Sequence, residues 1–299
     1  MPAPTGQLAA VALFLLGGLS FVVLNVLAKA LTPELGPVMV IWGRFLFHVL
    51  LTALLFPAAL RALARTGHPR VQAGRSVLLM LSTIFNFLAL WHLPLADVSA
   101  IVFTAPLLVA ALSVIIIKER VTARRWAAIL VGLLGALVVI QPTAGGLGVG
   151  ALLAAGCALA YALYQVSTRL VREAEPIVSL LYAGLSGAVL FTLLLPWGWQ
   201  APSLTQWLLL LLLGSCGAVG HLMVILALQR LEASRLAPFT YMQLVWAILA
   251  SLLVFGDIPG IATLAGATLI VASGLFVGWL NRREAGMARG AVATTRRTP

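Results

Sequence analysis

Residues 98–117, VSAIVFTAPLLVAALSVIII, contain no Asp, Glu, Lys or Arg. A helix that crosses the hydrocarbon core of a bilayer needs about 20 such residues. The same property holds for the runs 1–28, 45–60, 76–96, 126–168, 177–229, 236–256 and 258–281. Overall, 62% of the 299 residues are hydrophobic and 9% are charged, whereas soluble domains carry about 25% charged residues. The sequence therefore predicts an all-α membrane protein, with the lipid bilayer as its surroundings.

The composition also excludes other classes of protein. Low charge with high hydropathy argues against disorder, and the two cysteines, Cys157 and Cys216, lie in apolar runs rather than in a disulfide framework. The net charge of +11 raises the question of nucleic-acid binding. The basic residues, however, form short clusters between apolar runs, and we expect no nucleic-acid partner.

Turn residues divide the two double-length runs. Residues 141–146 (QPTAGG) split the first, and residues 196–203 (PWGWQAPS) split the second. The sequence then predicts ten transmembrane helices, at 7–29, 36–58, 74–92, 94–117, 122–141, 147–169, 177–197, 204–229, 233–255 and 258–281.

The distribution of basic residues predicts the orientation. With the N-terminus in the cytoplasm, every Lys and Arg except Lys29 and Arg44 falls on the cytoplasmic side. We expect both termini to be cytoplasmic and residues 282–299 to form a basic, disordered tail. Lys29 lies at an outer helix end, and Arg44 lies inside the second helix.

The two halves of the sequence resemble each other at an offset of 138–140 residues. Leu88–Leu93 aligns with Leu226–Leu231, Glu119 with Asp257, and Lys29 with Arg169. This predicts two five-helix repeats, at residues 1–142 and 143–281. Because five is odd, the second repeat is inverted, which is an arrangement of secondary transporters. The alternative is that helices rich in Leu and Ala simply look alike.

Several motifs of the first half resemble those of the drug/metabolite transporter superfamily, EamA type. They are Trp42–Phe45, Ala89–Ala100, Thr104–Leu107, Lys118–Thr122 and Gly132–Gly135. The resemblance covers about residues 8–281, is weaker in the second half, and is greatest to YddG-like aromatic amino acid exporters. It implies a bacterial inner-membrane exporter of aromatic amino acids and related metabolites that works by alternating access.

Arg44 is the clearest polar residue inside a predicted span. It lies about eight residues into the second helix, roughly 12 Å deep at 1.5 Å per residue. One interpretation is an anchor for a substrate carboxylate; the other is a structural arginine that bonds helix-end carbonyls or Asp97. His48, one turn further on, is either a cavity residue or a neutral histidine of the core.

The resemblance implies that the first, third, fourth, sixth, eighth and ninth helices line a central cavity. Together with Arg44 and His48, the predicted substrate-binding residues are Asn25, Ser82, Asn86, Thr104, Tyr164, His221, Tyr241, Gln243 and Trp246. Tyr161 and Gln165 lie on the same helices and are further polar candidates for the cavity wall. The alternative for each one is a hydrogen bond or a packing contact between helices. Pro106, Pro238 and Gly217 are candidate gating residues, although plain kinks and close packing explain them equally well.

No Asp or Glu lies deep in any predicted span. We therefore expect transport driven by the substrate gradient or weakly coupled to protons. We expect no metal or cofactor and no enzymatic activity, because no HExxH spacing or phosphate-binding loop is present. A channel is a further alternative. The expected partner is a small molecule, an amino acid, and the expected oligomeric state is a monomer or weak dimer. Alternative substrates are organic anions, nucleotide-linked sugars or drugs.

Overall fold

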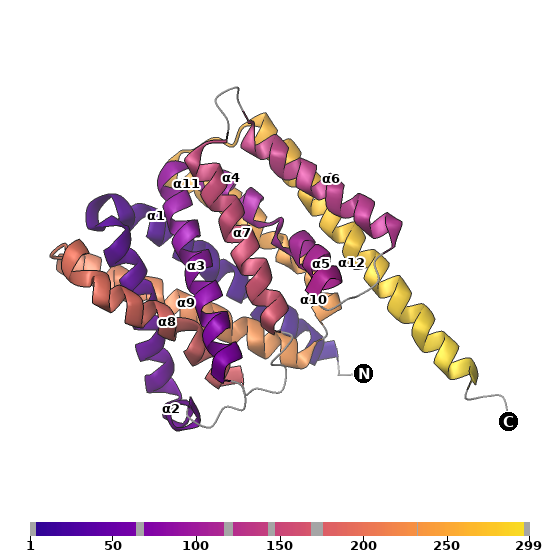
Figure 1. The fold of residues 1–299 in the computed structure, drawn as a ribbon, viewed down its shortest axis with the longest axis horizontal. Helices are drawn as coiled ribbons and strands as arrows, with labels where there is room; N and C mark the ends of the chain where they lie inside the picture. Colours follow the sequence, from indigo (N-terminus) through magenta and orange to yellow (C-terminus); the bar gives the residue numbers. More distant parts are fainter. Residues whose placement is uncertain are drawn as a thin grey trace.

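The computed structural model describes residues 4–63, 69–116, 122–142, 147–168, 176–231 and 233–295. Helices are the only regular secondary structure among these residues (Figure 1). The helices are α1 (Pro4–Leu55), α2 (Pro57–Leu63), α3 (Pro69–His92), α4 (Leu95–Val102), α5 (Ala105–Ile116), α6 (Ala123–Ile140), α7 (Val149–Thr168), α8 (Pro176–Gly198), α9 (Leu204–Arg230), α10 (Ala233–Thr240), α11 (Met242–Phe255) and α12 (Ile261–Thr295). Lys118–Val121 of the quoted motif, and Arg169, lie outside the described residues.

Nine apolar helical segments in this part of the chain are long enough to cross a bilayer. Many large apolar side chains on them are exposed, including Leu193, Leu253 and Trp197. Exposed apolar surface on this scale is what a hydrocarbon environment requires and what a soluble monomer avoids. The all-helical membrane class predicted from the sequence is therefore confirmed.

The longest apolar segment, Gln7–Leu55, has 49 residues and a break inside it. At Gly36 the backbone has φ 70° and ψ 159°, a non-helical conformation that only glycine adopts readily. The part of α1 before Gly36 packs antiparallel to α9, and the part after Gly36 packs parallel to it. The neighbouring pairs are Gly17 with Gly220, Leu24 with Gly217, Gly43 with Leu210, and Phe47 with Gly214. The chain therefore reverses its direction at Gly36.

Two helices predicted as continuous are divided. The predicted helix 94–117 becomes α4 and α5, with a turn at Phe103 and Thr104, and the predicted helix 233–255 becomes α10 and α11, with a turn at Tyr241. Pro106 lacks the N–H that would continue the helical ladder across the first break. The prediction of uninterrupted helices at 94–117 and 233–255 was therefore wrong.

The remaining boundaries follow the predicted ranges closely. A short helix, α2, overlaps the start of the predicted loop 59–75. Helix α12 continues to Thr295, so the prediction of a disordered tail from residue 282 was wrong. Helices α6 and α12 lie side by side at one edge of the bundle (Figure 1), where Gly135 and Gly266 allow a close approach of the two backbones.

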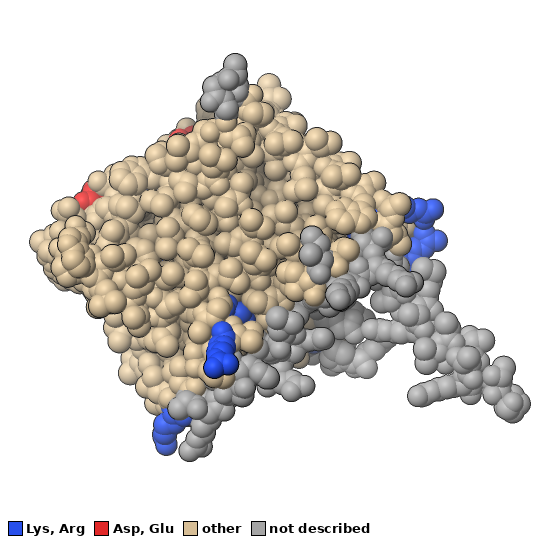
Figure 2. Space-filling model, in the orientation of Figure 1, with Lys and Arg blue, Asp and Glu red and all other residues tan. Residues whose placement is uncertain are grey.

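Charged side chains separate to opposite ends of the bundle. Figure 2 shows Lys and Arg along the lower and right-hand edges and acidic groups at the upper left. We call these the arginine end, which includes Arg61 of α2 and Arg230 in the last turn of α9 (Figure 1), and the acidic end, where Glu34 meets the first turn of α9. Lys29 is a cation at the acidic end, where it pairs with Asp257. The acidic side chains that the structure describes, Glu34, Asp97 and Asp257, all belong to the acidic end.

Small residues on α9 allow both arms of α1 to pack closely against it. A Cβ added at Gly214 would lie 2.5 Å from the Phe47 Cβ and 3.0 Å from the Gly43 carbonyl oxygen. At Gly217 the nearest atom would be 3.3 Å away. Gly214 therefore marks the tighter contact, and Gly217 borders more open space.

We predict that Gly214→Ala destabilises the protein by about 1–3 kcal/mol, since the methyl group overpacks a backbone contact. The measurement is thermal unfolding of the purified protein in detergent. Gly74→Ala on α3 is the matched control, because nothing lies within 4 Å of an added Cβ there. Equal stability of the two variants would contradict the packing described here.

Candidate functional site

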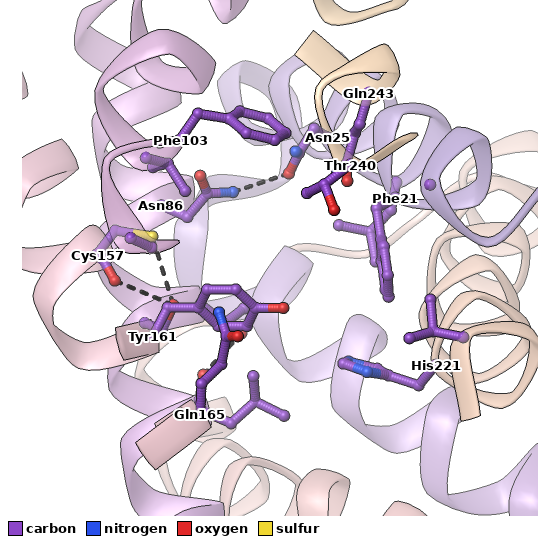
Figure 3. A pocket seen from close by; sticks show the side chains of 18 of the residues that line it. Phe21, Asn25, Asn86, Phe103, Cys157, Tyr161, Gln165, His221, Thr240 and Gln243 are labelled. Atoms are coloured by element: carbon purple, nitrogen blue, oxygen red, sulfur yellow. Dashed lines mark hydrogen bonds between the residues drawn. The ribbon is translucent and has the colours of Figure 1, made fainter. Parts of the chain in front are cut away.

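A cavity of about 450 Å³ lies inside the bundle. This volume falls in the range of small-molecule sites, about 300–1,000 Å³. Its walls come from α1, α3, α4, α5, α7, α9, α10 and α11, so both predicted repeats contribute. Figure 3 shows Tyr161 and Gln165 of α7 reaching into it opposite Phe21 and His221.

Amide and hydroxyl groups form one part of the wall. The Asn86 side-chain amide of α3 donates to the Asn25 Oδ1 of α1 at 2.8 Å (Figure 3). The Ser82 hydroxyl, one turn before Asn86, lies 3.4 Å from both the carbonyl oxygen and the Sγ of Cys157. These contacts hold the polar side chains in place. The remaining donors and acceptors of the two amides can still form hydrogen bonds with a solute.

Aromatic rings form a second part of the wall. Phe21 meets His221 edge to face, with ring centroids 4.8 Å apart. Phe103, at the break between α4 and α5, lies 6.1 Å from the ring of Tyr241, at the break between α10 and α11. The two interrupted helices therefore meet beside the cavity, and their turns lie where a solute would bind.

Arg44 is the positively charged group of this wall. Its side chain is 4% exposed, and its guanidinium carbon lies 4.3 Å from the centroid of the Phe45 ring. Of the two structural alternatives, a bond to Asp97 is absent, because Asp97 accepts a hydrogen bond from Thr263 at 2.6 Å. For helix-end carbonyls, Nε and Nη1 of Arg44 have no hydrogen-bond partner among the described residues.

The acidic end above the cavity is held by a different set of contacts. Lys29 forms an ion pair with Asp257 at 2.9 Å and donates to the carbonyl oxygen of Leu93 at 3.3 Å. These groups tie α1 to the end of α11 and to the end of α3. The cavity lining, in contrast, extends to Phe14, Leu228 and Leu236, toward the arginine end.

The structure brings many of the predicted site residues together and leaves others outside. The cavity is lined by Asn25, Arg44, Ser82, Asn86, Pro106, His221, Gln243 and Trp246. The predicted residues that do not line it are His48, Thr104, Tyr164, Gly217, Pro238 and Tyr241.

Each residue outside the lining has another place. His48 donates from Nε2 to the carbonyl oxygen of Leu180, Thr104 donates to the carbonyl oxygen of Ile101, and Tyr164 packs under the guanidinium of Arg75. Tyr241 packs against Phe103. Pro238 lies inside α10.

Several lining residues were not among the predicted binding residues. They include Phe21, Phe103, Cys157 and Thr240. Tyr161 and Gln165, which the sequence placed on a cavity-lining helix, also line the cavity, and they lie one turn apart on a common face of α7. The phenylalanines carry no such signal, because an apolar side chain in a span faces lipid as readily as a cavity. Among the described residues, no group of three His, Cys, Asp or Glu side chains is arranged to hold a metal.

Apolar helices long enough to span a bilayer, built around an apolar and aromatic cavity with a few polar groups, have the architecture of a multi-pass membrane transporter of small molecules. The particular family is shown by a family model that matches residues 8–141 and again residues 148–279. The chain belongs to the EamA-like transporter family.

Relatives with known activities cover most of the chain. The S-adenosylmethionine uptake transporter of Rickettsia bellii is 27% identical, over 88% of this chain and 91% of its own. The pseudopaline exporter CntI of Pseudomonas aeruginosa is 28% identical, over 88% and 93%. The riboflavin transporter of Rhizobium johnstonii is 28% identical, over 88% of each chain. Each is named as a transporter or an exporter, and their substrates differ.

A solved crystal structure shares the fold. Its TM-score is 0.64 at 23% identity, and the match covers 93% of this chain and 98% of that chain. At this identity the likeness concerns the fold alone. The family is therefore established, and the aromatic amino acid substrate stays a proposal.

We predict that Asn25→Ala and Asn86→Ala are coupled in stability, because each removes one partner of the same hydrogen bond. The coupling energy should be about 0.6 kcal/mol, the average for such bonds between membrane helices. A double-mutant cycle by unfolding in detergent measures it. Ser20→Ala is the control for α1, since Ser20 bonds its own helix at Leu16. Strict additivity for Asn25 and Asn86 would contradict the bond.

Proposed function

We propose that this protein is a secondary transporter that exports amino acids with aromatic or other apolar side chains, and related metabolites, across the bacterial inner membrane. Ten spans in two inverted five-helix repeats would enclose the cavity and expose it alternately to either side. The observation that carries the proposal is the cavity itself. Helices from both halves of the chain line it, and the two interrupted helices, α4–α5 and α10–α11, meet beside it.

The two helix breaks support the repeat. Phe103 and Tyr241 stand 138 positions apart, which is within the offset seen in the sequence. Transporter sites form at interrupted helices in corresponding positions of the two halves. The double match of the family model supports two copies. The reversal at Gly36 supports dividing the long segment into two spans, which would give ten.

The wall chemistry supports an aromatic zwitterion or a related solute. Phe21, Phe103, Tyr161 and Trp246 offer ring surfaces, and the amides offer donors and acceptors for polar groups. The relatives fit this pattern, because S-adenosylmethionine joins an amino acid to a heteroaromatic base and riboflavin carries a planar ring system. The acidic residues whose side chains are described lie away from the lining, which disfavours purely cationic drugs.

We propose that the present conformation faces the arginine end, which the positive-inside rule assigns to the cytoplasm. The lining continues toward that end, while the Lys29–Asp257 ion pair ties the helices together at the acidic end. In the alternating-access cycle, this ion pair would break when the cavity opens to the outside.

Uptake into proteoliposomes tests the substrate. We expect saturable counterflow of Trp, Phe or Tyr, and weaker counterflow of Met and Thr, because the ring surfaces reward aromatic side chains. S-adenosylmethionine and riboflavin serve as comparison solutes. Transport of only these two, with none of the amino acids, would refute the substrate proposal and leave the family assignment intact.

Loss of the ion pair should favour opening at the acidic end. In a background with Cys157→Ser and Cys216→Ser, a cysteine placed by Val102→Cys reports access to the cavity wall. We expect Asp257→Asn to speed its labelling by a membrane-impermeant thiol reagent several-fold from the acidic side, and the charge swap Lys29→Asp with Asp257→Lys to restore slow labelling.

Glu34→Gln is the matched control, since it removes an exposed acid of the same end whose partner is Gln206. Its labelling rate should stay at the starting value. If Asp257→Asn labels no faster than Glu34→Gln, the ion pair does not hold this end closed.

A further inference from the structure

Arg44 is a buried cation whose donors lack acceptors. Its Nε and Nη1 are buried and donate to no acceptor among the described residues. The described acidic side chains are engaged elsewhere: Asp257 with Lys29, Asp97 with Thr263, and Glu34 with Gln206. An uncompensated buried charge is costly, and inside a membrane such charges mark ligand or ion sites.

A second buried arginine shows that this state is specific to Arg44. Arg75 is 5% exposed, nearly as buried as Arg44. Its Nη1 donates to Gln72 Oε1 at 2.6 Å, and its Nε donates to Thr168 Oγ1 at 3.1 Å. The fold therefore satisfies a buried guanidinium where the role is structural, and Arg44 in the cavity wall is left unsatisfied.

The histidine beside Arg44 also presents an unused nitrogen. His48 Nε2 lies 3.1 Å from the carbonyl oxygen of Leu180. A carbonyl only accepts, so Nε2 carries the hydrogen, and Nδ1 of the neutral ring is an acceptor. Nδ1 is buried with no partner in the part of the chain that the structure describes. The His48 ring lies 5.9 Å from the ring of His221, which lines the cavity.

Arg44 and His48 face the same point on α9. A Cβ added at Gly217 would lie 3.3 Å from Leu24 Cδ1, 3.5 Å from His48 Nδ1 and 4.0 Å from Arg44 Cζ. Arg44 itself lines the cavity, together with His221 one turn further along α9. The guanidinium fork has the geometry to bind a carboxylate through two parallel hydrogen bonds.

We propose that Arg44, with His221 in the same wall, forms an anion subsite that binds the carboxylate of the transported solute. The rest of the solute then extends toward Asn25, Asn86 and the aromatic wall. This inference rests on the proposed function and deepens it, because it makes a carboxylate the required group and assigns no counter-charge to an amine.

A matched ligand series tests the subsite on the full-length protein in detergent. 3-Phenylpropionate has the carboxylate without the amine, phenethylamine has the amine without the carboxylate, and L-phenylalanine has both. Binding is measured by calorimetry. We expect L-phenylalanine and 3-phenylpropionate to bind at least about tenfold more tightly than phenethylamine, as a charge-assisted bond implies.

Variants then assign the preference to Arg44. Arg44→Gln should reduce the preference for the carboxylate to near unity, and Arg44→Lys should retain part of it. Arg75→Gln is the control: it removes a satisfied buried arginine, so it should lower the unfolding temperature and leave the preference unchanged. If Arg44→Gln does not fold, the ligand series on the unmodified protein and Arg44→Lys still decide the question.

The outcomes separate the two proposals. Binding of 3-phenylpropionate without L-phenylalanine would keep the subsite and overturn the amino acid substrate. Binding of L-phenylalanine with phenethylamine as tight as 3-phenylpropionate would keep the substrate and overturn the subsite. Binding of none of the three would overturn both.

Discussion

The hydrocarbon core offers no water to backbone amides and carbonyls, so each must find a partner within the chain. Long α-helices meet this requirement, and the apolar side chains exposed on them meet lipid. Interruptions are tolerated only where protein or a cavity replaces the missing partners. The break at Thr104 follows this rule: its N–H and its hydroxyl both donate to the Ile101 carbonyl oxygen. The break at Tyr241 lies across from it, beside the same cavity.

The same low-dielectric medium decides where charges can lie. Lys29 and Asp257 pair with each other at the acidic end, where water is near. Arg75 lies deeper and is bonded by side chains of α3 and α7. Arg44 has the charge and the burial of Arg75 without its partners. Since that arrangement costs free energy, its position in a cavity wall connects the electrostatics of the fold with ligand recognition.

Close packing of helices brings the pieces of this wall together. Within lipid, association of helices depends on van der Waals contact and hydrogen bonds rather than on the hydrophobic effect. Gly214 and Gly220 let both arms of α1 approach α9 closely, and this approach sets His48 of one arm near His221 of α9. The site therefore depends on the close approach of the α1 and α9 backbones, which these glycines permit.

The sequence by itself determined the membrane class, the approximate spans and the family motifs, because apolar run length and turn residues are local properties. It also indicated Arg44 and Asn86 as polar groups at depth. Only the tertiary structure decided that Asn86 bonds Asn25, that Tyr164 turns to Arg75 rather than to the cavity, and that Lys29 meets Asp257, 228 positions away. The physical reason is that lipid and protein interior are both apolar, so the rotation of each helix about its axis is set by packing against its neighbours.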